Sequence, residues 1–200
     1  IVRHYGLPGD KICVIYNGII LSQFDPASGK KAGEILRREL RIPQGAKALL
    51  FVGSGFERKG LKFLIRALAL LDKEVRLVVI GKGAIKNYLK EAQRLGVRDR
   101  VTFIGPVKDV VRYYFAGDIF VLPSIYEPFS NACLEAMASG MPVVTSRANG
   151  ASEIITEPLN GAIIEDPTNP EEIAGKIKLF LDDRKRLDAG RAARMTAQKY

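Results

Sequence analysis

The sequence predicts an α/β protein with a Rossmann-like, doubly wound, mostly parallel sheet of about six to seven strands flanked by helices. Three observations support this fold class. Short, continuously apolar runs recur along the chain, segments with helical periodicity lie between them, and Gly or Pro bounds several of these segments. Apolar runs without polar alternation are typical of strands covered on both faces. Strands that alternate with helices favour βαβ units with right-handed crossovers.

The expected strands are the apolar runs. They span residues 12–16, 48–53, 75–81, 101–105, 118–123, 142–146 and 161–165. The expected helices span residues 59–71, 84–96, 108–117, 130–139 and 170–183, and the last residues of the chain continue a helical pattern. Gly96 and Gly117 stand where helix C-caps stand, and Pro170 opens a helix at its first turn. Residues 22–33 form the loosest stretch and are expected to be an exposed loop.

Length and composition fit one large globular domain. The chain has 200 residues, of which 47% are apolar, enough for a sizeable core. No apolar run approaches the roughly 18 residues that a membrane-spanning helix needs. Cys13 and Cys133 lie far apart in apolar surroundings, so we expect buried reduced thiols and a cytoplasmic location. The first residue is not Met and the helical pattern runs to the last one, so we expect a fragment of a longer chain.

The net charge of +9 favours a phosphate-bearing partner or peripheral contact with an anionic membrane, such as the inner face of the cell membrane. A plainer explanation is that the surface helices are rich in Lys and Arg. The basic residues are scattered from Arg37 to Lys199 and form no single tract. Composition alone leaves both explanations open.

Several catalytic centres are excluded by the residues that the chain lacks. The only histidine is His4, which is expected on the surface. A Ser-His-Asp triad, a Cys-His pair and a His-based zinc site therefore cannot be built. The strand ends also carry no pair of acids with the spacing of a metal-binding DxD motif, so we expect no metal.

In a sheet of this kind, ligands bind beyond the carboxyl ends of the strands. The loops that follow the expected strands are rich in Gly, basic residues and hydroxyl groups. They span residues 54–60, 81–83, 106–108, 124–131 and 146–152. This composition predicts a phosphate-binding rim.

The loop GSGFERKG (53–60) carries the strongest basic signal of that rim. It is not a dinucleotide fingerprint, because the GxGxxG pattern would need Gly where Arg58 stands, and it does not fit a Walker A loop. It delivers Arg58 and Lys59 to the expected start of a helix. A forked guanidinium beside an ammonium, near helix-terminal N–H groups, suits a diphosphate. The alternative is a solvated basic helix start, although cations there oppose the helix dipole.

The stretch EPFSNACLE (127–135) places two acids eight positions apart. Pro128 keeps Glu127 extended and outside the following helix. Ser130 can cap that helix and leave its first amides free to face an anion. Glu135 lies on the helix, beside its apolar stripe. The alternatives are that Glu135 is a solvated helical acid and that Glu127 complements the helix dipole.

The stretch from Glu127 through Val144 resembles the E-x7-E signature of retaining, nucleotide-sugar-dependent glycosyltransferases of family four. Residues 14–19, 52–60, 101–110 and 150–155 agree with that family in the same order and cover nearly the whole chain. The sequence therefore resembles the C-terminal, donor-binding half of a two-domain GT-B enzyme. The RKG form of its basic loop is most similar to lipopolysaccharide-core glucosyltransferases. The resemblance implies that residues 1–200 form the donor domain and that an N-terminal acceptor domain is absent.

The resemblance also implies a role for individual residues. Arg58 and Lys59 would grip the diphosphate, Glu135 the ribose hydroxyls, Glu127 the donor sugar hydroxyls, and backbone near Val107 the base. The implied catalytic residues are Arg58, Lys59 and Glu127, and the implied donor-binding residues are Gly53, Ser54, Val107, Phe129, Ser130, Asn131, Ala132 and Glu135. Two positions depart from the family pattern. Ser54 stands where many members carry Arg, and Ser130 where Gly is usual.

The resemblance implies a UDP- or GDP-linked sugar as substrate, no cofactor, a glycan or lipid acceptor held by the missing half, and no nucleic acid. Retention would follow from attack on the same face of the sugar, with the leaving-group oxygen accepting the acceptor's proton. Two alternatives remain. A glycoside hydrolase would use Glu127 and Glu135 as a carboxylate pair, one with a raised pKa. A non-catalytic module binding nucleic acid or membrane would gather basic and aromatic residues on one face.

Overall fold

A computed structural model describes residues 2–6 and 8–200 and is built around a parallel sheet of six strands. The strands are β1 (Ala48–Val52), β2 (Arg76–Ile80), β3 (Val101–Gly105), β4 (Ile119–Leu122), β5 (Val143–Ser146) and β6 (Gly161–Ile164). Their order is β3-β2-β1-β4-β5-β6, and every neighbouring pair in it is parallel. This order is that of a doubly wound sheet whose direction of winding reverses between β1 and β4. The predicted fold class is confirmed.

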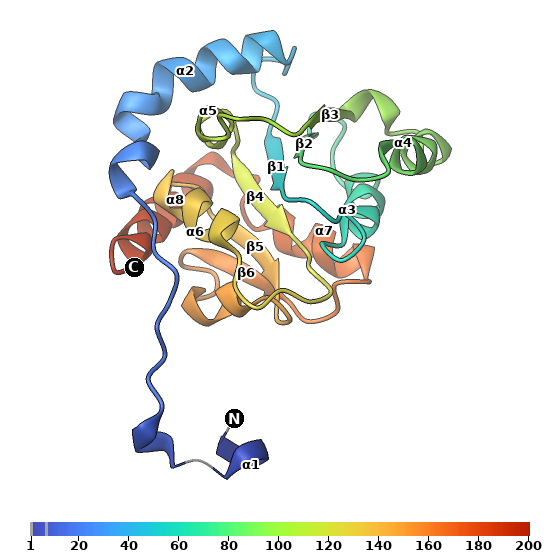
Figure 1. The fold of residues 1–200 in the computed structure, drawn as a ribbon. Coiled ribbons are helices and arrows are strands. Elements are labelled where there is room, and N and C mark those ends of the chain that lie inside the picture. Colours follow the sequence, from blue (N-terminus) through green and yellow to red (C-terminus); the bar gives the residue numbers. More distant parts are fainter. Residues whose placement is uncertain (1, 7) are drawn as a thin grey trace.

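Helices cover both faces of the sheet (Figure 1). They are α1 (Val2–Tyr5), α2 (Pro26–Glu39), α3 (Leu61–Leu68), α4 (Ile85–Arg94), α5 (Val111–Tyr114), α6 (Asn131–Ala138), α7 (Pro170–Lys178) and α8 (Asp183–Ala197). Short 3-10 turns are η1 (Gly9–Lys11), η2 (Leu21–Phe24), η3 (Arg98–Arg100) and η4 (Gly150–Ile154). Helix α3 packs against α4 and α7, α6 against α8, and α2 against α5. Both faces of the sheet are therefore covered.

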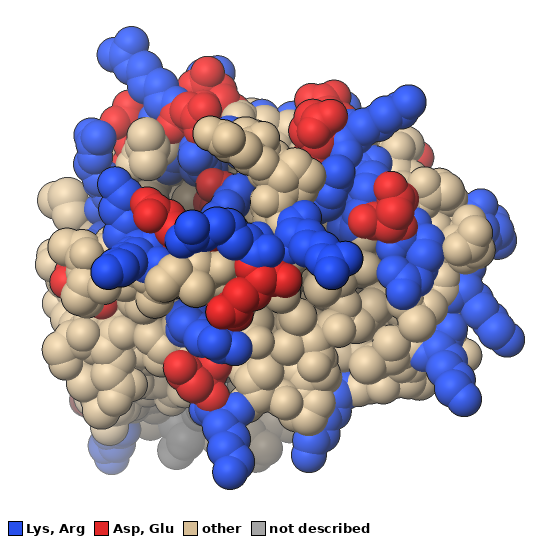
Figure 2. Space-filling model, turned by 90° about the horizontal axis from the view of Figure 1, so that it is seen from above, with Lys and Arg blue, Asp and Glu red and all other residues tan. Residues whose placement is uncertain are grey.

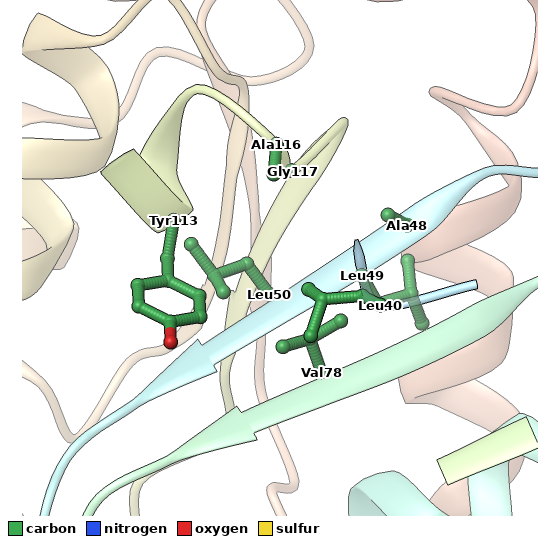
Figure 3. A pocket seen from close by; sticks show the side chains of 8 residues that line it. All are labelled: Leu40, Ala48, Leu49, Leu50, Val78, Tyr113, Ala116 and Gly117. Atoms are coloured by element: carbon green, nitrogen blue, oxygen red, sulfur yellow. The ribbon is translucent and has the colours of Figure 1, made fainter. Parts of the chain in front are cut away.

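The core lies between the sheet and these helices. All residues of β4, β5 and β6 are buried, as continuous apolar runs predict for strands covered on two faces. Figure 3 shows a small apolar crevice beneath β1, where Leu50, Val78 and Tyr113 meet. It leaves no space for a water molecule, so it is packed core and not a ligand site.

The expected strand at 12–16 is wrong. Residues 12–20 form no helix or strand, and the side chains of Val14 and Ile15 are 68% and 88% exposed. Figure 1 shows this part of the chain as an extended segment away from the sheet. An apolar run becomes a strand only when a neighbouring strand satisfies its backbone, and this run has no such neighbour in the described chain. Cys13 lies in the same run and is exposed, which corrects the expectation of a buried thiol, whereas Cys133 is buried.

The expected loop at 22–33 is also wrong, because most of it lies in η2 and α2. The side chain of Asp25 accepts a hydrogen bond from the Ser28 amide, and Pro26 occupies the first turn, so the helix start has ordinary capping chemistry. Gly29 and Gly33 serve packing and do not break the helix. A Cβ atom on Gly33 would lie 2.1 Å from the carbonyl oxygen of Phe115.

Other helix boundaries need smaller corrections. Helix α3 begins at Leu61, so the two basic residues before it lie in the preceding turn. The helix expected at 108–117 shortens to α5. The helix expected at 170–183 ends at Lys178, and Asp182 caps a separate α8. The predicted C-cap at Gly96 is confirmed by its left-handed backbone, with a φ of 69°.

The charged residues are mixed on the surface. Figure 2 shows Lys and Arg side chains spread over one face with Asp and Glu side chains between them. His4 is exposed, as expected. In the described part of the chain, no helix is both long and apolar enough to cross a membrane.

Candidate functional site

The loops after β1 and β4 bring three predicted site residues together at the carboxyl edge of the sheet. Lys59 Nζ lies 2.7 Å from Glu127 Oε2, and Arg58 Nη1 lies 2.9 Å from the same oxygen. The Lys59 and Glu127 side chains are only 11% and 12% exposed, whereas that of Arg58 is 48% exposed. Because β1 and β4 are neighbours in the sheet, residues 68 positions apart can meet here. We call Arg58, Lys59 and Glu127 the ion cluster.

Glycines and backbone bonds hold the basic loop in place. Gly60 has a φ of 73°, and a Cβ atom there would lie 2.0 Å from the carbonyl oxygen of Pro123. A Cβ atom on Gly53 would lie 2.4 Å from the Lys59 side chain, so the missing side chain gives the lysine room to cross the loop. The amide of Ile125 donates to the carbonyl of Arg58 at 2.8 Å and ties the two loops together.

The electrostatics of Glu127 are set by opposing effects. Burial raises the pKa of the Glu127 carboxyl, but the hydrogen bonds and charges of Lys59 and then Arg58 outweigh it, and the net pKa is lowered. Glu127 is therefore ionised at neutral pH. Arg58 also donates to the carbonyl of Tyr126 at 2.8 Å, which leaves other N–H groups of its guanidinium for a ligand.

The loop after β5 holds Glu127 from its other side. The Glu127 amide donates to the carbonyl of Ala148 at 3.0 Å, and the Gly150 amide donates to the carbonyl of Glu127 at 2.9 Å. Asn149, fully buried between them, donates to Thr145 Oγ1 at 2.9 Å and accepts from the Ala151 amide at 3.1 Å. These bonds fix the backbone that carries Glu127.

The first turn of α6 presents free donors beside the ion cluster. Ser130 is the N-cap residue by position, but its side chain makes no capping bond. In residues 2–6 and 8–200, the amides of Asn131 and Ala132 donate to no protein acceptor. The side chain of Asn131 accepts from Asn17 at 2.8 Å. Free amides at a helix start can bind an anion.

Phe129 precedes this turn and packs against Tyr16, in the extended N-terminal segment of residues 12–20. Its ring centroid lies 6.0 Å from that of Tyr16, at an interplanar angle of 60°. Tyr16 also donates to Glu153 in η4 at 3.0 Å. The N-terminal segment therefore crosses the rim of the site close to α6.

The second acid of the motif has a different setting. Glu135 Oε2 accepts a 2.6 Å hydrogen bond from the hydroxyl of Tyr114 in α5. Tyr114 is 1% exposed, and Glu135 is half-buried. Among the described residues, Glu135 makes no hydrogen bond or ion pair with the ion cluster. The structure thus separates the two acids.

Two predicted site residues lie apart from the ion cluster. Val107 is in the loop after β3, at the edge of the sheet, and packs half-buried against the core. Ser54 is exposed, and its hydroxyl accepts from the Lys82 amide at 3.2 Å. Ser54 and Val107 both lie in loops that follow the carboxyl ends of strands. Neither makes a hydrogen bond with Arg58, Lys59 or Glu127 in the described chain.

A groove of about 1040 Å³ adjoins the ion cluster on the side of α3 and α4. The residues that line it include Arg58, Lys62, Tyr88 and Ile125. Among the described residues, no group of three His, Cys, Asp or Glu side chains is arranged to hold a metal ion.

Sequence reasoning missed Tyr114 and Asn149 as residues of the site. Tyr114 gives no local signal, because it is 21 positions from Glu135 and meets it only through the packing of α5 on the sheet. Asn149 lies in a loop that was expected at the rim, and its position three residues after the end of β5 was the available signal.

Residues 33–196 match the family described as "Glycosyl transferases group 1". An uncharacterized glycosyltransferase of Methanocaldococcus jannaschii is 39% identical over 184 residues, which cover 90% of this chain and 47% of that protein. The chain spans about half the length of the curated relatives that it matches.

Two solved structures resemble the whole fold. WaaG, described as a glycosyltransferase involved in lipopolysaccharide biosynthesis, aligns with a TM-score of 0.87 and 27% identity, over 100% of this chain and 55% of that one. HepE of Anabaena, solved in complex with UDP and glucose, aligns with a TM-score of 0.87 and 26% identity, over 97% of this chain and 54% of that one. With a family match over most of its sequence and a relative at 39% identity, the chain belongs to the group 1 glycosyl transferases.

Proposed function

We propose that this chain is the donor-binding half of a GT-B glycosyltransferase and holds a UDP- or GDP-linked sugar. The observation that carries the proposal is the ion cluster, in which a buried Lys59 and a half-exposed Arg58 converge at the carboxyl edge of the sheet. Donors of this kind bind a diphosphate strongly, because their hydrogen bonds are charge-assisted. The presence of UDP in the HepE structure makes UDP the first nucleotide to test.

The remaining parts of the donor would lie around this diphosphate. The free amides of Asn131 and Ala132 add uncharged donors on one side. Glu135, with one oxygen bonded to Tyr114, would accept hydrogen bonds from the ribose. Backbone near Val107 would meet the base, and Glu127 would contact the donor sugar. The two acids would then bind the two sugars of one donor.

The chemistry needs charge stabilisation more than an acid or a base. When the bond between the sugar and the diphosphate breaks, negative charge grows on the leaving oxygen. Arg58 and Lys59 are already oriented toward that edge of the sheet and would stabilise the charge without a metal ion or cofactor. We further propose retention by same-face attack, in which the leaving oxygen takes the proton of the acceptor.

The acceptor would bind mainly to the other half of the enzyme. The relatives are about twice as long as this chain, so a second domain would supply the acceptor pocket. A glycan or lipid acceptor fits the resemblance to WaaG. We further propose peripheral contact with an anionic membrane, which the positive net charge favours and which a lipid acceptor would require.

The two alternatives have less support. A glycoside hydrolase has no diphosphate to hold, so it gives Arg58 and Lys59 no role, and the pKa of Glu127 is lowered and not raised. A nucleic-acid module needs a dense basic face, and on the face that Figure 2 shows, acidic side chains lie between the basic ones.

The test is calorimetric titration of the 200-residue chain with UDP and GDP, once in buffer containing EDTA and once with added Mg²⁺. We expect one of the two nucleotides to bind in both buffers. If neither binds in either buffer, the donor-site proposal fails, and if binding occurs only with Mg²⁺, the metal-free part fails. Incubation with labelled nucleotide sugars and glycan or lipid acceptors tests the half-enzyme proposal, because sustained transfer by this chain alone would contradict it.

A further inference from the structure

Glu135 is held from one side only. Its Oε2 accepts the 2.6 Å hydrogen bond from Tyr114, whereas Oε1 has no hydrogen-bond partner within residues 2–6 and 8–200. Glu135 is half-buried, so its carboxylate remains within reach of a ligand. One carboxylate oxygen is therefore bonded to Tyr114, and the other is free to accept a hydrogen bond from a ligand.

The direction of this hydrogen bond is fixed. Burial raises the pKa of the Tyr114 hydroxyl well above its usual value, and the charge of Glu135 and the hydrogen bond to it raise it further. The phenol therefore keeps its proton at all ordinary pH values. Tyr114 is therefore the donor in this hydrogen bond, and Glu135 Oε2 is the acceptor.

The ring of Tyr114 is itself immobilised by packing. Phe24 lies edge-on to it at 5.7 Å, and Phe120 of β4 lies on another side at 6.1 Å. Figure 1 shows α2 passing over α5, and Gly29 and Gly33 allow this close approach. A Cβ atom on Gly29 would lie 2.3 Å from the ring of Phe115, the residue after Tyr114. Elements from three parts of the chain thus fix the position of the phenol.

We propose that Tyr114 is a positioning residue that sets the ribose specificity of the donor site by locking the Glu135 carboxylate in one orientation. This inference rests on the proposed function. A locked carboxylate presents its free oxygen at a defined point, where a ribose hydroxyl can donate to it. A site built to accept from a hydroxyl discriminates against the analogue that lacks it. A carboxylate free to rotate would bind water or a hydroxyl with less distinction.

The test compares UDP with 2′-deoxy-UDP, or the guanosine pair if GDP is the nucleotide that binds. Calorimetry is run on the wild-type chain, on Tyr114→Phe and on the control Tyr113→Phe. Tyr113 is the neighbouring buried tyrosine of α5, but its ring lies in the apolar crevice of Figure 3, and its hydroxyl meets Arg112 at 3.5 Å. The control removes a hydroxyl of the same kind without touching Glu135.

We expect the wild type to prefer the ribonucleotide by about tenfold, the worth of a hydrogen bond to a charged group. In Tyr114→Phe the preference should fall to about twofold, because ribonucleotide affinity drops while deoxyribonucleotide affinity stays nearly constant. Tyr113→Phe should keep the wild-type preference. A preference retained in Tyr114→Phe, or an equal loss for both nucleotides, would overturn the positioning role.

The other outcomes separate this inference from the proposed function. A wild type that binds neither nucleotide contradicts both. If the wild type binds the ribonucleotide and the deoxyribonucleotide equally well, the proposed diphosphate site stands. The ribose role of Glu135 and this inference are then contradicted. If Tyr114→Phe does not fold, Phe24→Leu loosens the same ring and keeps its hydroxyl. That variant should lower the preference by about two- to threefold, and an unchanged preference would overturn the inference.

Discussion

The two acids of the E-x7-E stretch lie eight residues apart but occupy opposite electrostatic environments. Glu127 sits between two cations, at 2.7 and 2.9 Å, in the loop that follows β4. Glu135 sits on α6 against one neutral phenol and has a free oxygen. Both are carboxylates, so the difference comes from the burial of each and from the groups that surround it. Glu127 is an internal counter-ion for the cations, whereas Glu135 has one oxygen free to accept a further hydrogen bond.

This difference predicts which part of a ligand each acid affects. A diphosphate that binds Arg58 and Lys59 must share those cations with Glu127, so the ion cluster should respond to any anion of suitable shape. Glu135 offers nothing to phosphate and should respond only to ligands with a sugar. Inorganic diphosphate and a nucleoside diphosphate therefore distinguish the two regions.

The largest effect is expected from Lys59→Ala. Removing this cation takes a charge-assisted partner from any diphosphate, so affinity for both inorganic diphosphate and UDP should fall about 10- to 100-fold. It also leaves the buried Glu127 with only the exposed Arg58, so the free energy of unfolding should fall by about 3 kcal/mol. Calorimetry measures the first change and denaturant unfolding the second.

Lys62→Ala is the matched control for this variant. Lys62 is an exposed lysine one position into α3, beside the same groove. Its loss should change diphosphate affinity by less than about threefold, as expected for an exposed charge. Equal effects of the two substitutions would mean that general positive charge, and not the ion cluster, binds the anion.

The next largest effect is expected from Glu135→Ala, and it should be selective. UDP affinity should fall about tenfold or more, because a charged acceptor for the ribose is lost. Affinity for inorganic diphosphate should stay the same. Calorimetry with both ligands on one preparation gives the comparison directly, and a parallel loss for both would show that the substitution damages the whole site.

The sequence predicts the sheet well and the contacts across it poorly. The six strands follow from continuous apolar runs, but residues 12–16 have the same local pattern and lie exposed. A local pattern measures whether a segment could be buried in a sheet, and it cannot tell whether a neighbouring strand is present. The opposite error was made at residues 22–33, where a loop was expected and most residues lie in η2 and α2, including Gly29 and Gly33. They indicate a loop by propensity, yet they allow α2 to pack closely on α5.

In the site, too, local sequence patterns predict residue types and positions but not the contacts between distant residues. Arg58 and Lys59 were expected to bind a diphosphate because of their residue types and their position after a strand, whereas the role of Glu127 was implied by the family resemblance. Their pairing with one another depends on the strand order, which places β1 beside β4. The hydrogen bond between Tyr114 and Glu135 depends on how the four-residue helix α5 packs against the rest of the fold. No spacing in the sequence predicts that packing. The roles of these residues in binding remain predictions.

A smaller effect with the opposite sign is expected from Glu127→Gln. This substitution removes the internal counter-ion, so affinity for inorganic diphosphate should rise about three- to tenfold. If Glu127 also contacts the donor sugar, the extra affinity of a nucleotide sugar over its nucleoside diphosphate should shrink in the same variant. Calorimetry with the three ligands separates the two effects. A fall in affinity for inorganic diphosphate would contradict the counter-ion role.

The smallest effect concerns stability and pH. Because the pKa of Glu127 is lower in the folded chain than in the unfolded one, its ion pairs stabilise the fold above the unfolded pKa. That stabilisation should disappear as the pH falls from about 4.5 through the lowered folded pKa. We expect it to amount to about 1 kcal/mol, or roughly 2–4 °C in melting temperature, because the Arg58 side chain is half-exposed to solvent. Glu127→Gln should therefore melt below the wild type at pH 7, and the gap should close towards pH 3.

Comparing the effect of Glu127→Gln on melting temperature in the wild type and in Lys59→Ala tests this account most directly. Burial is the largest single influence on the pKa of Glu127, and it raises that pKa, so the lowering depends on both cations. Without Lys59, burial is opposed by Arg58 alone, and an ionised Glu127 should no longer stabilise the fold. Glu127→Gln should then be neutral or stabilising at pH 7, which reverses its sign between the two backgrounds. Melting curves of the four proteins at pH 7 and pH 3 complete this double-mutant cycle. An equal loss in both backgrounds would mean that Glu127 is held by its backbone bonds to the loop after β5, with little contribution from its charge.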